Sequence, residues 1–409
     1  MNYRFVKITS FYREYLDYYY DKYPEIKNKS YQEQFQHLME QDFAWSNYYQ
    51  KNLNKLGVES YEIICNARYL QEAWANENGF KQNGKQLIIE QLKKIKPDVL
   101  FFQDTSLFHG EWVKQLKEKI HSIKKIIGFR CSPYSNELAE LFNCFDFMIV
   151  CSNQFVDELK RFGYKTYEIN HAFENSIISK ITNNNSQPVT DFIFIGSILS
   201  GIGFHSQRKK FIETIINKNI DLTLFGNVPE IGSFDLKSRQ AAFLMVRLMK
   251  KLGMKSLINS LPLLNKAINL NSMPQKNIIS KKLQEKVHPP IYGIDMLQLL
   301  NKAKITFNIH ADVSGNAAAN IRIFEATGCG SCLLTDWKPN INKFFEEDKE
   351  IVTYKTEDEC IEKALWLIEH NNEREQIAQS GQKRTLSEHN YYNRAIQLNE
   401  IINKELKKY

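Results

Sequence analysis

Short apolar runs rich in β-branched and aromatic residues recur along the chain, separated by stretches with the spacing of amphipathic helices. This alternation is typical of parallel strands joined by crossover helices. In the first half it predicts strands over residues 5–10, 61–66, 98–103, 125–130, 145–151 and 166–170. It also predicts a helix over 31–57 that ends at Gly57, while Pro97 ends the helix before the third strand.

A polar stretch at 183–188 interrupts the pattern, which then starts again. The second half predicts strands over 191–196, 221–226, 305–310, 332–336 and 350–353. Three consecutive helical stretches follow from Glu357 to the end. We therefore predict an α/β protein with two Rossmann-like domains, residues 1–185 and 186–385, and a C-terminal helix over 386–409.

The composition is consistent with two domains that each have a hydrophobic core, because the chain has 409 residues of which 43% are hydrophobic. The net charge of +7 is too small for a dedicated nucleic-acid binder, so we expect no nucleic-acid partner. The charge is concentrated, since residues 236–286 carry eleven positive side chains and one negative one. We treat this segment as a basic insertion in the second domain.

The seven cysteines lie mostly in apolar runs, so we expect the reduced, buried thiols of a cytoplasmic protein. Cys329 and Cys332 have the C-x-x-C spacing, but without a second pair or a nearby histidine we expect no metal site. The N-terminus lacks an apolar signal core, and no run of 18 apolar residues occurs. We expect a cytoplasmic protein, with peripheral binding to the inner face of the membrane as a further option.

Several enzyme classes are excluded by missing motifs. The turn after the strand at 191–196 reads Gly-Ser-Ile-Leu-Ser-Gly-Ile-Gly. It has neither the G-x-G-x-x-G fingerprint of dinucleotide binding nor the Gly-Lys-Ser/Thr ending of a P-loop. The chain also lacks the G-x-S-x-G elbow and the H-E-x-x-H zinc motif. We therefore expect no resident cofactor.

Candidate chemistry concentrates in residues 305–336. The strand there ends in Asn308 and His310, a turn with Gly315 and Asn316 follows, and a helix of small residues is predicted next. The exposed N–H groups at a helix N-terminus attract anions, so this turn is a candidate phosphate site.

Two charged residues on that helix, Arg322 and Glu325, are three positions apart and share one edge. An arginine near the helix mouth suits a diphosphate, and a carboxylate one turn deeper suits the paired hydroxyls of a ribose. The alternative is a surface or interdomain ion pair of little consequence.

A resemblance to a known family adds to this interpretation. The chain resembles the CgeB-like (spore-maturation type) glycosyltransferases, and its second half resembles their glycosyl transferase group 1 domain. The similarity is carried by residues 308–336, flanked by 290–296, 350–354 and 378–386, and in the first half by 56–60, 71–75, 96–99 and 170–173. It covers nearly the whole chain and is weakest over 230–285.

The resemblance implies a GT-B fold, in which two Rossmann-like domains face each other across a cleft and the C-terminal helices cross back. The C-terminal domain would bind a sugar nucleotide and the N-terminal domain the acceptor. Many retaining GT-B enzymes carry two glutamates separated by seven residues, the second of which holds the ribose. Glu325 matches the second position, but Ala317 stands at the first. The donor sugar and the stereochemical outcome therefore stay open.

The same comparison implies further donor-side residues. Ser197, His205 and Arg208 lie in the first loop and helix of the second domain, where such enzymes meet the diphosphate or the sugar. Tyr292 and Gly293 lie in the loop that presents groups to the nucleobase. The alternative for Arg208 and the two lysines after it is the solvated face of a basic helix.

Acceptor-side candidates are residues at strand ends, because ligands bind beyond the carboxyl ends of parallel strands. Asp104 and Arg130 end two strands, and His171 lies at the domain junction. A carboxylate or an imidazole would serve as general base if the reaction inverts configuration. We predict Asp104, His171 and Arg322 as catalytic residues, with Asp42 as a weaker candidate, against the alternative that each is structural.

The basic insertion contains an amphipathic stretch over 241–254 with apolar residues on one face and cations on the other. Such a helix suits an anionic membrane surface or a polyanionic acceptor. The alternative is an ordinary helical elaboration packed on the domain.

Together these inferences predict a metal-independent glycosyltransferase, of hexosyl or related specificity, that acts in polysaccharide biosynthesis. It would move a sugar from a nucleotide-sugar donor to a glycan, a lipid-linked acceptor or a surface polymer. Two alternatives stay open. One is a nucleotide-sugar epimerase on the same fold. The other is an inactive sugar-nucleotide-binding or scaffold protein, an alternative that Ala317 keeps open.

Overall fold

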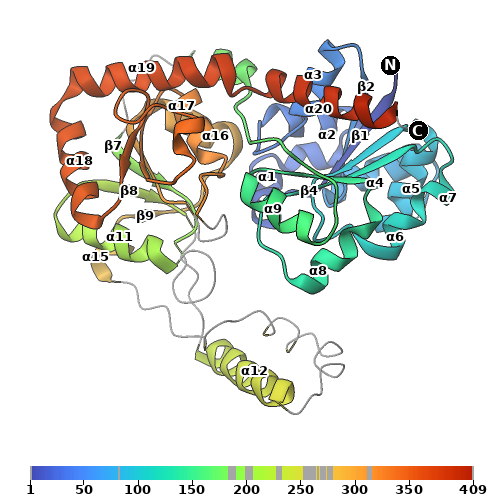
Figure 1. The fold of residues 1–409 in the computed structure, drawn as a ribbon, viewed down its shortest axis with the longest axis horizontal. Helices are drawn as coiled ribbons and strands as arrows, with labels where there is room; N and C mark the ends of the chain where they lie inside the picture. The colour runs from blue at the N-terminus through green and yellow to red at the C-terminus, as the bar shows by residue number, and fades with distance from the viewer. Residues whose placement is uncertain are drawn as a thin grey trace.

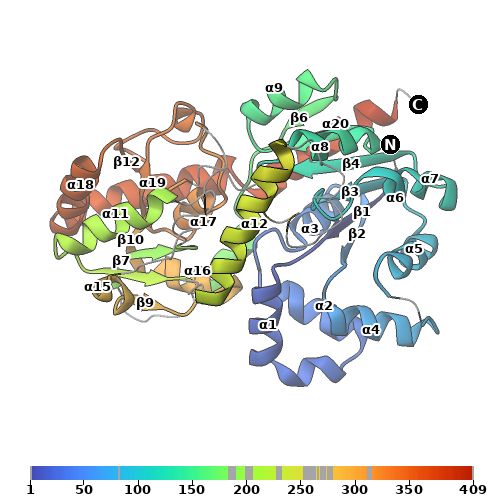
Figure 2. The ribbon, with the colours of Figure 1, turned by 90° about the horizontal axis from the view of Figure 1, so that it is seen from below.

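The computed structural model describes residues 2–81, 83–182, 190–198, 206–226, 233–251, 264, 267, 273, 280–310 and 316–407. These residues form two six-stranded parallel sheets, each covered by helices (Figure 1). The two sheets lie side by side, as the view from below also shows (Figure 2). We call them the first and the second domain.

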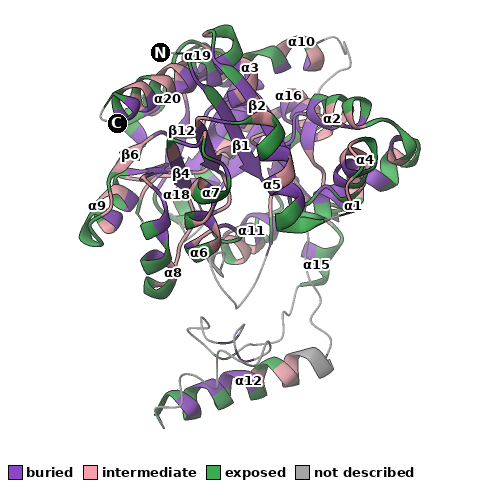
Figure 3. Ribbon diagram, turned by 90° about the vertical axis from the view of Figure 1, so that its right-hand side faces the viewer, coloured by how far each residue is buried: buried purple, intermediate pink, exposed green. Residues whose placement is uncertain are grey.

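The first sheet has the strand order β2-β1-β3-β4-β5-β6. Its strands are β1 (Arg4–Thr9), β2 (Glu59–Ile64), β3 (Val99–Phe102), β4 (Lys125–Arg130), β5 (Phe147–Val150) and β6 (Thr166–Glu168). Each overlaps a strand predicted from the sequence. The central strands β3, β4 and β5 are nearly continuous apolar runs because helices cover both faces of a parallel sheet. Figure 3 shows the inner strands buried within the domain, whereas β6 at the edge is half-buried.

Ten α-helices and three short 3-10 helices are described in the first domain. The α-helices are α1 (Arg13–Lys22), α2 (Tyr31–Glu40), α3 (Tyr48–Lys55), α4 (Arg68–Glu77), α5 (Gly84–Ile95), α6 (Gly110–Lys114), α7 (Leu116–Lys119), α8 (Asn136–Glu140), α9 (Asn153–Arg161) and α10 (Ile178–Ile181). The 3-10 helices are η1 (Pro24–Asn28), η2 (Leu141–Cys144) and η3 (Asn175–Ile177).

The predicted single helix over 31–57 is wrong, because the structure divides it into α2 and α3. Ser30 starts α2 with a capping box formed with Glu33. The break follows at Asp42 and Ala44, whose φ angles of 50° and 47° lie in the left-handed region. A helix cannot continue through such residues, so the segment between α2 and α3 becomes a loop.

The second sheet has the order β12-β11-β10-β7-β8-β9. Its strands are β7 (Thr190–Ile195), β8 (Leu222–Phe225), β9 (Val287–His288), β10 (Ala303–Asn308), β11 (Cys332–Asp336) and β12 (Val352–Tyr354). Its helices are α11 (Ser206–Asn217), α12 (Ser233–Lys251), α15 (Lys281–Gln284), α16 (Gly293–Lys302), α17 (Arg322–Gly328), η5 (Ile341–Lys343), α18 (Glu357–Glu369), α19 (Asn371–Glu388) and α20 (Tyr391–Leu406). The edge strand β9 was not predicted, because two residues are too short to show a period.

The C-terminal helix α20 crosses back to the first domain, as Figure 1 shows along the top of the molecule. The ring of Tyr391 packs against that of Tyr48 in α3 at a centroid distance of 4.8 Å. Arg394 Nε donates a hydrogen bond of 3.0 Å to the carbonyl of Asn170. The expected return of the C-terminal helices is therefore confirmed.

The basic helix α12 stands apart from both sheets in Figures 1 and 3. Ala242, Val246 and Met249 are buried in a small cluster of their own with Leu264 and Ala267. Among the described helices, none combines the length and the apolar character needed to span a bilayer.

Candidate functional site

The strand order of each sheet reverses at one point, and ligands of open α/β sheets bind beyond the strand ends at such points. In the first sheet the reversal lies between β1 and β3, which are paired in parallel. Ser10 follows β1 and Asp104 lies just beyond β3. In the second sheet the reversal lies between β7 and β10, and Ser197 and His310 follow these strands. Predicted residues therefore lie at both reversal points, Asp104 at the first and Ser197 and His310 at the second.

A cavity of about 370 Å³ lies at the carboxyl ends of the first sheet and reaches the second domain. The first domain contributes most of its wall, and three residues of the second domain close it. The lining residues are Ser10, Tyr12, Trp45, Gln103, Asp104, Ser106, Phe129, Arg130, Cys131, Ser132, His171, Ala319, Asn320 and Ile321. Two of the three residues predicted as catalytic, Asp104 and His171, are therefore brought together in one cavity.

The carboxylate of Asp104 is held by two serines. Ser10 Oγ donates a hydrogen bond of 2.6 Å to one oxygen, and the backbone N–H of Ser106 donates one of 3.0 Å to the other. The hydroxyl of Ser106 donates to the same oxygen as its N–H. Both serines line the cavity, so Asp104 presents an oriented carboxylate to whatever occupies it.

Arg130 and Tyr12 add a cation and a phenol to the same wall. Arg130 Nε donates to the carbonyl of Ser132 over 2.8 Å, and burial lowers the pKa of Arg130 while the charge of Asp104 opposes this shift. Partial burial, and then the charges of Glu325 and Asp104, raises the pKa of Tyr12, although the residue is still 55% exposed. Tyr12 therefore lies within electrostatic reach of carboxylates from both domains.

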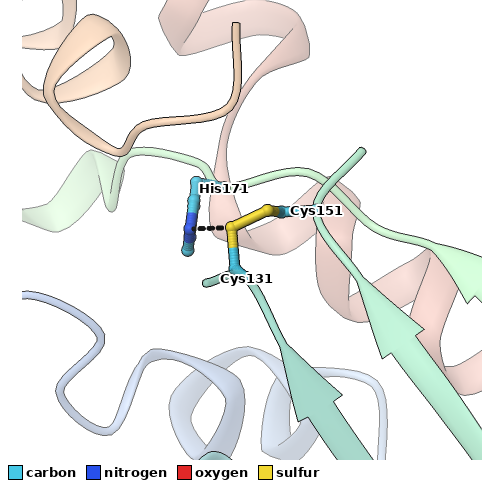
Figure 4. Close-up of side chains that lie close together, drawn as sticks. All are labelled: Cys131, Cys151 and His171. Atoms are coloured by element: carbon cyan, nitrogen blue, oxygen red, sulfur yellow. Dashed lines mark hydrogen bonds between the residues drawn. A yellow bond between two sulfur atoms is a disulfide. The ribbon is translucent and has the colours of Figure 1, made fainter. Parts of the chain in front are cut away.

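His171 lies beside a disulfide that was not expected. Its Nε2 atom is 3.2 Å from Cys131 Sγ, and Cys131 is bonded to Cys151 (Figure 4). The expectation of seven reduced thiols is thus wrong for this pair, because β4 and β5 place the two residues next to each other. Burial, and then the charge of Arg394, lowers the pKa of His171 to about 4, so the imidazole is neutral at pH 7.

Arg322 and Glu325 form an ion pair, with Nη1 of Arg322 2.9 Å from Oε2 of Glu325. Glu325 is buried, which raises its pKa, and the charge of Arg322 opposes this shift. The predicted helix of small residues after Asn316 is wrong, because α17 begins only at Arg322. The chain before it is irregular, held by two hydrogen bonds between Ala318 and Asn340. It is this irregular segment that faces the cavity.

Asn308 and His310 are buried at the end of β10 and are tied to β11. Asn308 donates a hydrogen bond of 2.9 Å to Thr335 Oγ1 and accepts one of 2.9 Å from Asn320, which lines the cavity. His310 Nδ1 lies 2.7 Å from Oδ1 of Asp336. Burial alone would raise the pKa of Asp336, but the charge and hydrogen bonds of His310 hold it below its usual range.

The other predicted donor-side residues lie in different surroundings. Arg208 donates two hydrogen bonds, of 3.1 and 2.9 Å, to the carbonyl of Ile309, and Ser197 is exposed nearby with its carbonyl 3.4 Å from Nη1 of Arg208. Asn316 is exposed. His205 and Gly315 lie outside the described residues.

Tyr292 and Gly293 lie at a contact between the domains and not in the wall of the cavity. The ring of Tyr292 packs edge-on against Tyr15 and Phe43 of the first domain. A Cβ on Gly293, whose φ is +55°, would lie 2.5 Å from the carbonyl oxygen of Gln41. That carbonyl also accepts a 2.6 Å hydrogen bond from the N–H of Ile294. Gly293 is thus needed for the close approach of the two backbones.

Asp42, the weaker candidate, does not line the cavity. Its side chain is fully buried and is ion-paired with Lys180 of α10. Lys51 lies 3.9 Å from its other oxygen. The arrangement fits a structural link between the loop after α2 and the end of the first domain.

Sequence reasoning missed Ser10, Tyr12, Trp45 and Asn320 as cavity residues. Ser10 had a usable signal, since it ends the first predicted strand. Trp45 had no such signal in the sequence. Lys7 of β1, 38 positions earlier in the chain, donates a hydrogen bond of 2.7 Å to the carbonyl of Trp45. Its place in the cavity depends on that tertiary contact.

Comparison with known proteins places these features in a wider context. A family model described as glycosyl transferase-like matches residues 264–400, which include α17, β10 and β11. No curated protein matches the sequence. The matched segment contains Asn308, His310, Arg322 and Glu325.

Solved structures match over the whole chain at low identity. A glycosyltransferase from Rickettsia africae superposes with a TM-score of 0.57 at 11% identity, covering 100% of both chains. The Anabaena protein HepE in complex with UDP and glucose gives 0.56 at 10% identity, covering 98% of this chain and all of that one. A sucrose-phosphate synthase from Thermosynechococcus elongatus gives 0.54 at 10% identity, covering 99% and 100%. The predicted GT-B fold is therefore confirmed, with a glycosyl transferase-like segment in its second domain.

Proposed function

We propose that this protein is a glycosyltransferase that uses a nucleotide-sugar donor bound by the second domain and an acceptor bound in the cavity of the first. One observation carries the proposal: Asp104 and His171 of the first domain share a cavity with the segment that leads into Arg322 and Glu325 of the second. The glycosyl transferase-like match over 264–400 supports the donor side, and the UDP and glucose bound to HepE support a nucleotide sugar.

Asp104 is assigned as the general base toward the acceptor. Its carboxylate is held by Ser10 and Ser106, which fixes the orientation needed for proton abstraction. The neutral imidazole of His171 lies in the same wall and can accept a hydrogen bond from a second acceptor hydroxyl. Arg130 supplies a cation nearby, which suits an acceptor that carries negative charge.

The donor would be held by the groups that end β7 and β10 and begin α17. Glu325 is assigned to the ribose hydroxyls and Arg322 to the diphosphate, since a guanidinium stabilises the charge that grows on the leaving group. Binding the donor would separate their ion pair of 2.9 Å. Arg208 holds the carbonyl of Ile309, so it supports the end of β10 beside His310.

The first prediction tests the ribose assignment. Glu325→Gln should weaken binding of a nucleoside diphosphate by about 1.5–3 kcal/mol, on the order of tenfold to a hundredfold in Kd, because hydrogen bonds to a charged group are lost. Isothermal titration with UDP, GDP and ADP measures the change and identifies the base. Glu405→Gln is the control, as Glu405 is a buried carboxylate of α20 outside the cavity. Equal affinity of wild type and Glu325→Gln would remove Glu325 from the site.

The finer features of the proposed function are a CgeB-like subtype, a hexosyl donor, a polysaccharide or lipid-linked acceptor, independence of divalent metal and a cytoplasmic location. Support for the subtype comes from the motif around Arg322 and Glu325. Activity that survives EDTA would support metal independence, and loss restored by magnesium or manganese would contradict it. Product analysis separates a transferase, which releases a nucleoside diphosphate, from an epimerase, which returns an isomeric nucleotide sugar. An inactive binding protein would do neither.

The helix α12 is proposed to bind an anionic membrane surface, where a lipid-linked acceptor would be found. Leu244, Met245 and Leu248 are exposed on it by 56%, 50% and 58%. Arg247 and Lys250 are also exposed on this helix. Apolar side chains with interleaved cations are typical of helices that lie in the membrane interface.

The second prediction tests this surface. Charge reversal at Arg247, Lys250 and Lys251 should weaken binding to vesicles rich in phosphatidylglycerol by at least about 100-fold, since each cation contributes about 1 kcal/mol near such a surface and reversal adds repulsion. Added salt should weaken the wild type in the same way. Co-sedimentation with anionic and neutral vesicles measures both effects. Reversal of Lys81, Lys93 and Lys94 in the first domain is the matched control. Absence of binding to anionic vesicles at low salt would show that α12 does not bind a membrane surface.

A further inference from the structure

A disulfide on the wall of the cavity has no part in the proposed transfer reaction. Cys131 follows β4, Cys151 follows β5 and His171 lies beyond β6, so three neighbouring strands deliver them to one place (Figure 4). The register of β4 and β5 pairs Arg130 with Val150. The residues that follow them, Cys131 and Cys151, therefore lie opposite each other. Their Cα atoms are 5.4 Å apart, within the range that a disulfide requires. The sheet itself therefore builds this pair.

The two sulfur atoms differ in access. Cys131 is half-buried and lines the cavity, whereas Cys151 is fully buried and does not line it. A thiol that enters the cavity can therefore reach Cys131 Sγ and not Cys151 Sγ. The cavity has room for such a molecule, with a volume of about 370 Å³.

The surroundings of Cys131 suit both redox states. In the oxidised pair the sulfur of Cys131 lies 3.2 Å from His171 Nε2 and 3.7 Å from the carbonyl oxygen of Ala319 in the second domain. Once reduced, the Cys131 thiol can donate a hydrogen bond to either acceptor. The redox state thus alters a contact between the two domains at the cavity.

We propose that Cys131 and Cys151 form a thiol–disulfide exchange site whose ligand is a low-molecular-weight thiol bound in the cavity. The thiolate attacks Cys131 Sγ, the bond between Cys131 and Cys151 breaks, and Cys151 leaves as a thiolate that takes up the proton released by the incoming thiol. The thiolate of a second molecule then attacks the sulfur of the first, and the bond to Cys131 Sγ breaks. The two small thiols leave as a disulfide, Cys131 takes up the proton of the second thiol, and both cysteines are reduced. The mixed disulfide at Cys131 occupies the space beside Asp104 and Arg130.

This inference rests on the proposed function in one respect: a mixed disulfide at Cys131 would block acceptor binding only if the cavity is the acceptor site. The exchange chemistry itself is read by mass and needs no transferase activity. Failure of the proposed function would leave the exchange result unchanged, so the two outcomes are distinguishable.

The experiment uses the full chain and glutathione as the probe. Free thiols are first alkylated, the protein is incubated with reduced glutathione, and the reaction is stopped with acid before peptide mapping. We expect glutathione on Cys131 and a newly free thiol at Cys151. The Cys151→Ser variant, given oxidised glutathione, should be modified at Cys131 about tenfold or more faster than at Cys65. Cys65 is a suitable internal reference, being half-buried with a pKa that burial raises to about 12.

The Cys131→Ser variant should lose the modification, and Cys65→Ser should keep it. Glutathione attached to Cys151, or a wild-type protein in which both cysteines alkylate before any reduction, would overturn the proposal. So would one zinc ion per reduced chain that is lost in Cys131→Ser, since the two sulfurs and His171 Nε2 lie within 4.8 Å of one another and would then form a metal site. Mapping of the wild type decides the question even if a variant fails to fold.

Discussion

Asp104→Asn is expected to lower the turnover of sugar transfer by about 10²–10⁴-fold, because an amide cannot take the proton of the acceptor hydroxyl. The substitution preserves the shape of the side chain and can still accept the 2.6 Å hydrogen bond from Ser10. The Kd of the donor should be unchanged, since Asp104 belongs to the first domain. Release of nucleoside diphosphate from a nucleotide sugar, measured with and without acceptor glycans, gives the rate.

Asp98→Asn is the matched control for this prediction. Asp98 lies just before β3, at the opposite end of the strand that Asp104 follows, and forms an ion pair of 2.8 Å with Lys124. Its replacement should leave turnover within about twofold of the wild type, because surface ion pairs contribute little. Near-normal turnover of a folded Asp104→Asn protein would show that Asp104 only positions the loop around it.

Lys7→Met is expected to destabilise the protein by about 3–5 kcal/mol, the largest effect on stability predicted here. Lys7 and Glu62 are both fully buried on adjacent strands, with Nζ 3.3 Å from Oε1 of Glu62. Lys7 also donates hydrogen bonds of 2.7 Å to the carbonyls of Trp45 and Ser46. Burial lowers the pKa of Lys7 and raises the pKa of Glu62, and the charge of each partner opposes the shift of the other. Removing Lys7 therefore takes away the interaction that offsets the burial of Glu62.

The double variant Lys7→Met, Glu62→Leu should recover part of this loss, because no unpaired charge is left in the core. Recovery should be incomplete, since the carbonyls of Trp45 and Ser46 lose their donor and each unsatisfied buried group costs about 1–3 kcal/mol. Urea unfolding of the wild type, both single variants and the double variant gives the coupling free energy. A Lys7→Met protein as stable as the wild type would show that the pair is not a buried ion pair.

The local pattern of residues determined the architecture to a large extent. Each predicted strand corresponds to a strand of the two sheets, because strands covered on both faces are rich in apolar residues. Asp104 and His310 were found for a related reason, since polar residues directly after buried strands gather at the carboxyl edge of a parallel sheet. Where backbone conformation broke the pattern, as at Asp42 and Ala44, the prediction of a single helix was wrong.

Contacts between residues far apart in the chain were decided only by the tertiary structure. Cys131 and Cys151 meet because the register of β4 on β5 aligns residues 20 positions apart, which no spacing in the sequence reveals. Tyr292 packs against Tyr15 because α16 lies against the first domain. The cavity combines Asp104 with Asn320 for the same reason. Hydrophobic periodicity predicts whether a residue is buried, but not which residue it contacts. Strand register and the packing of the two domains against each other determine that contact.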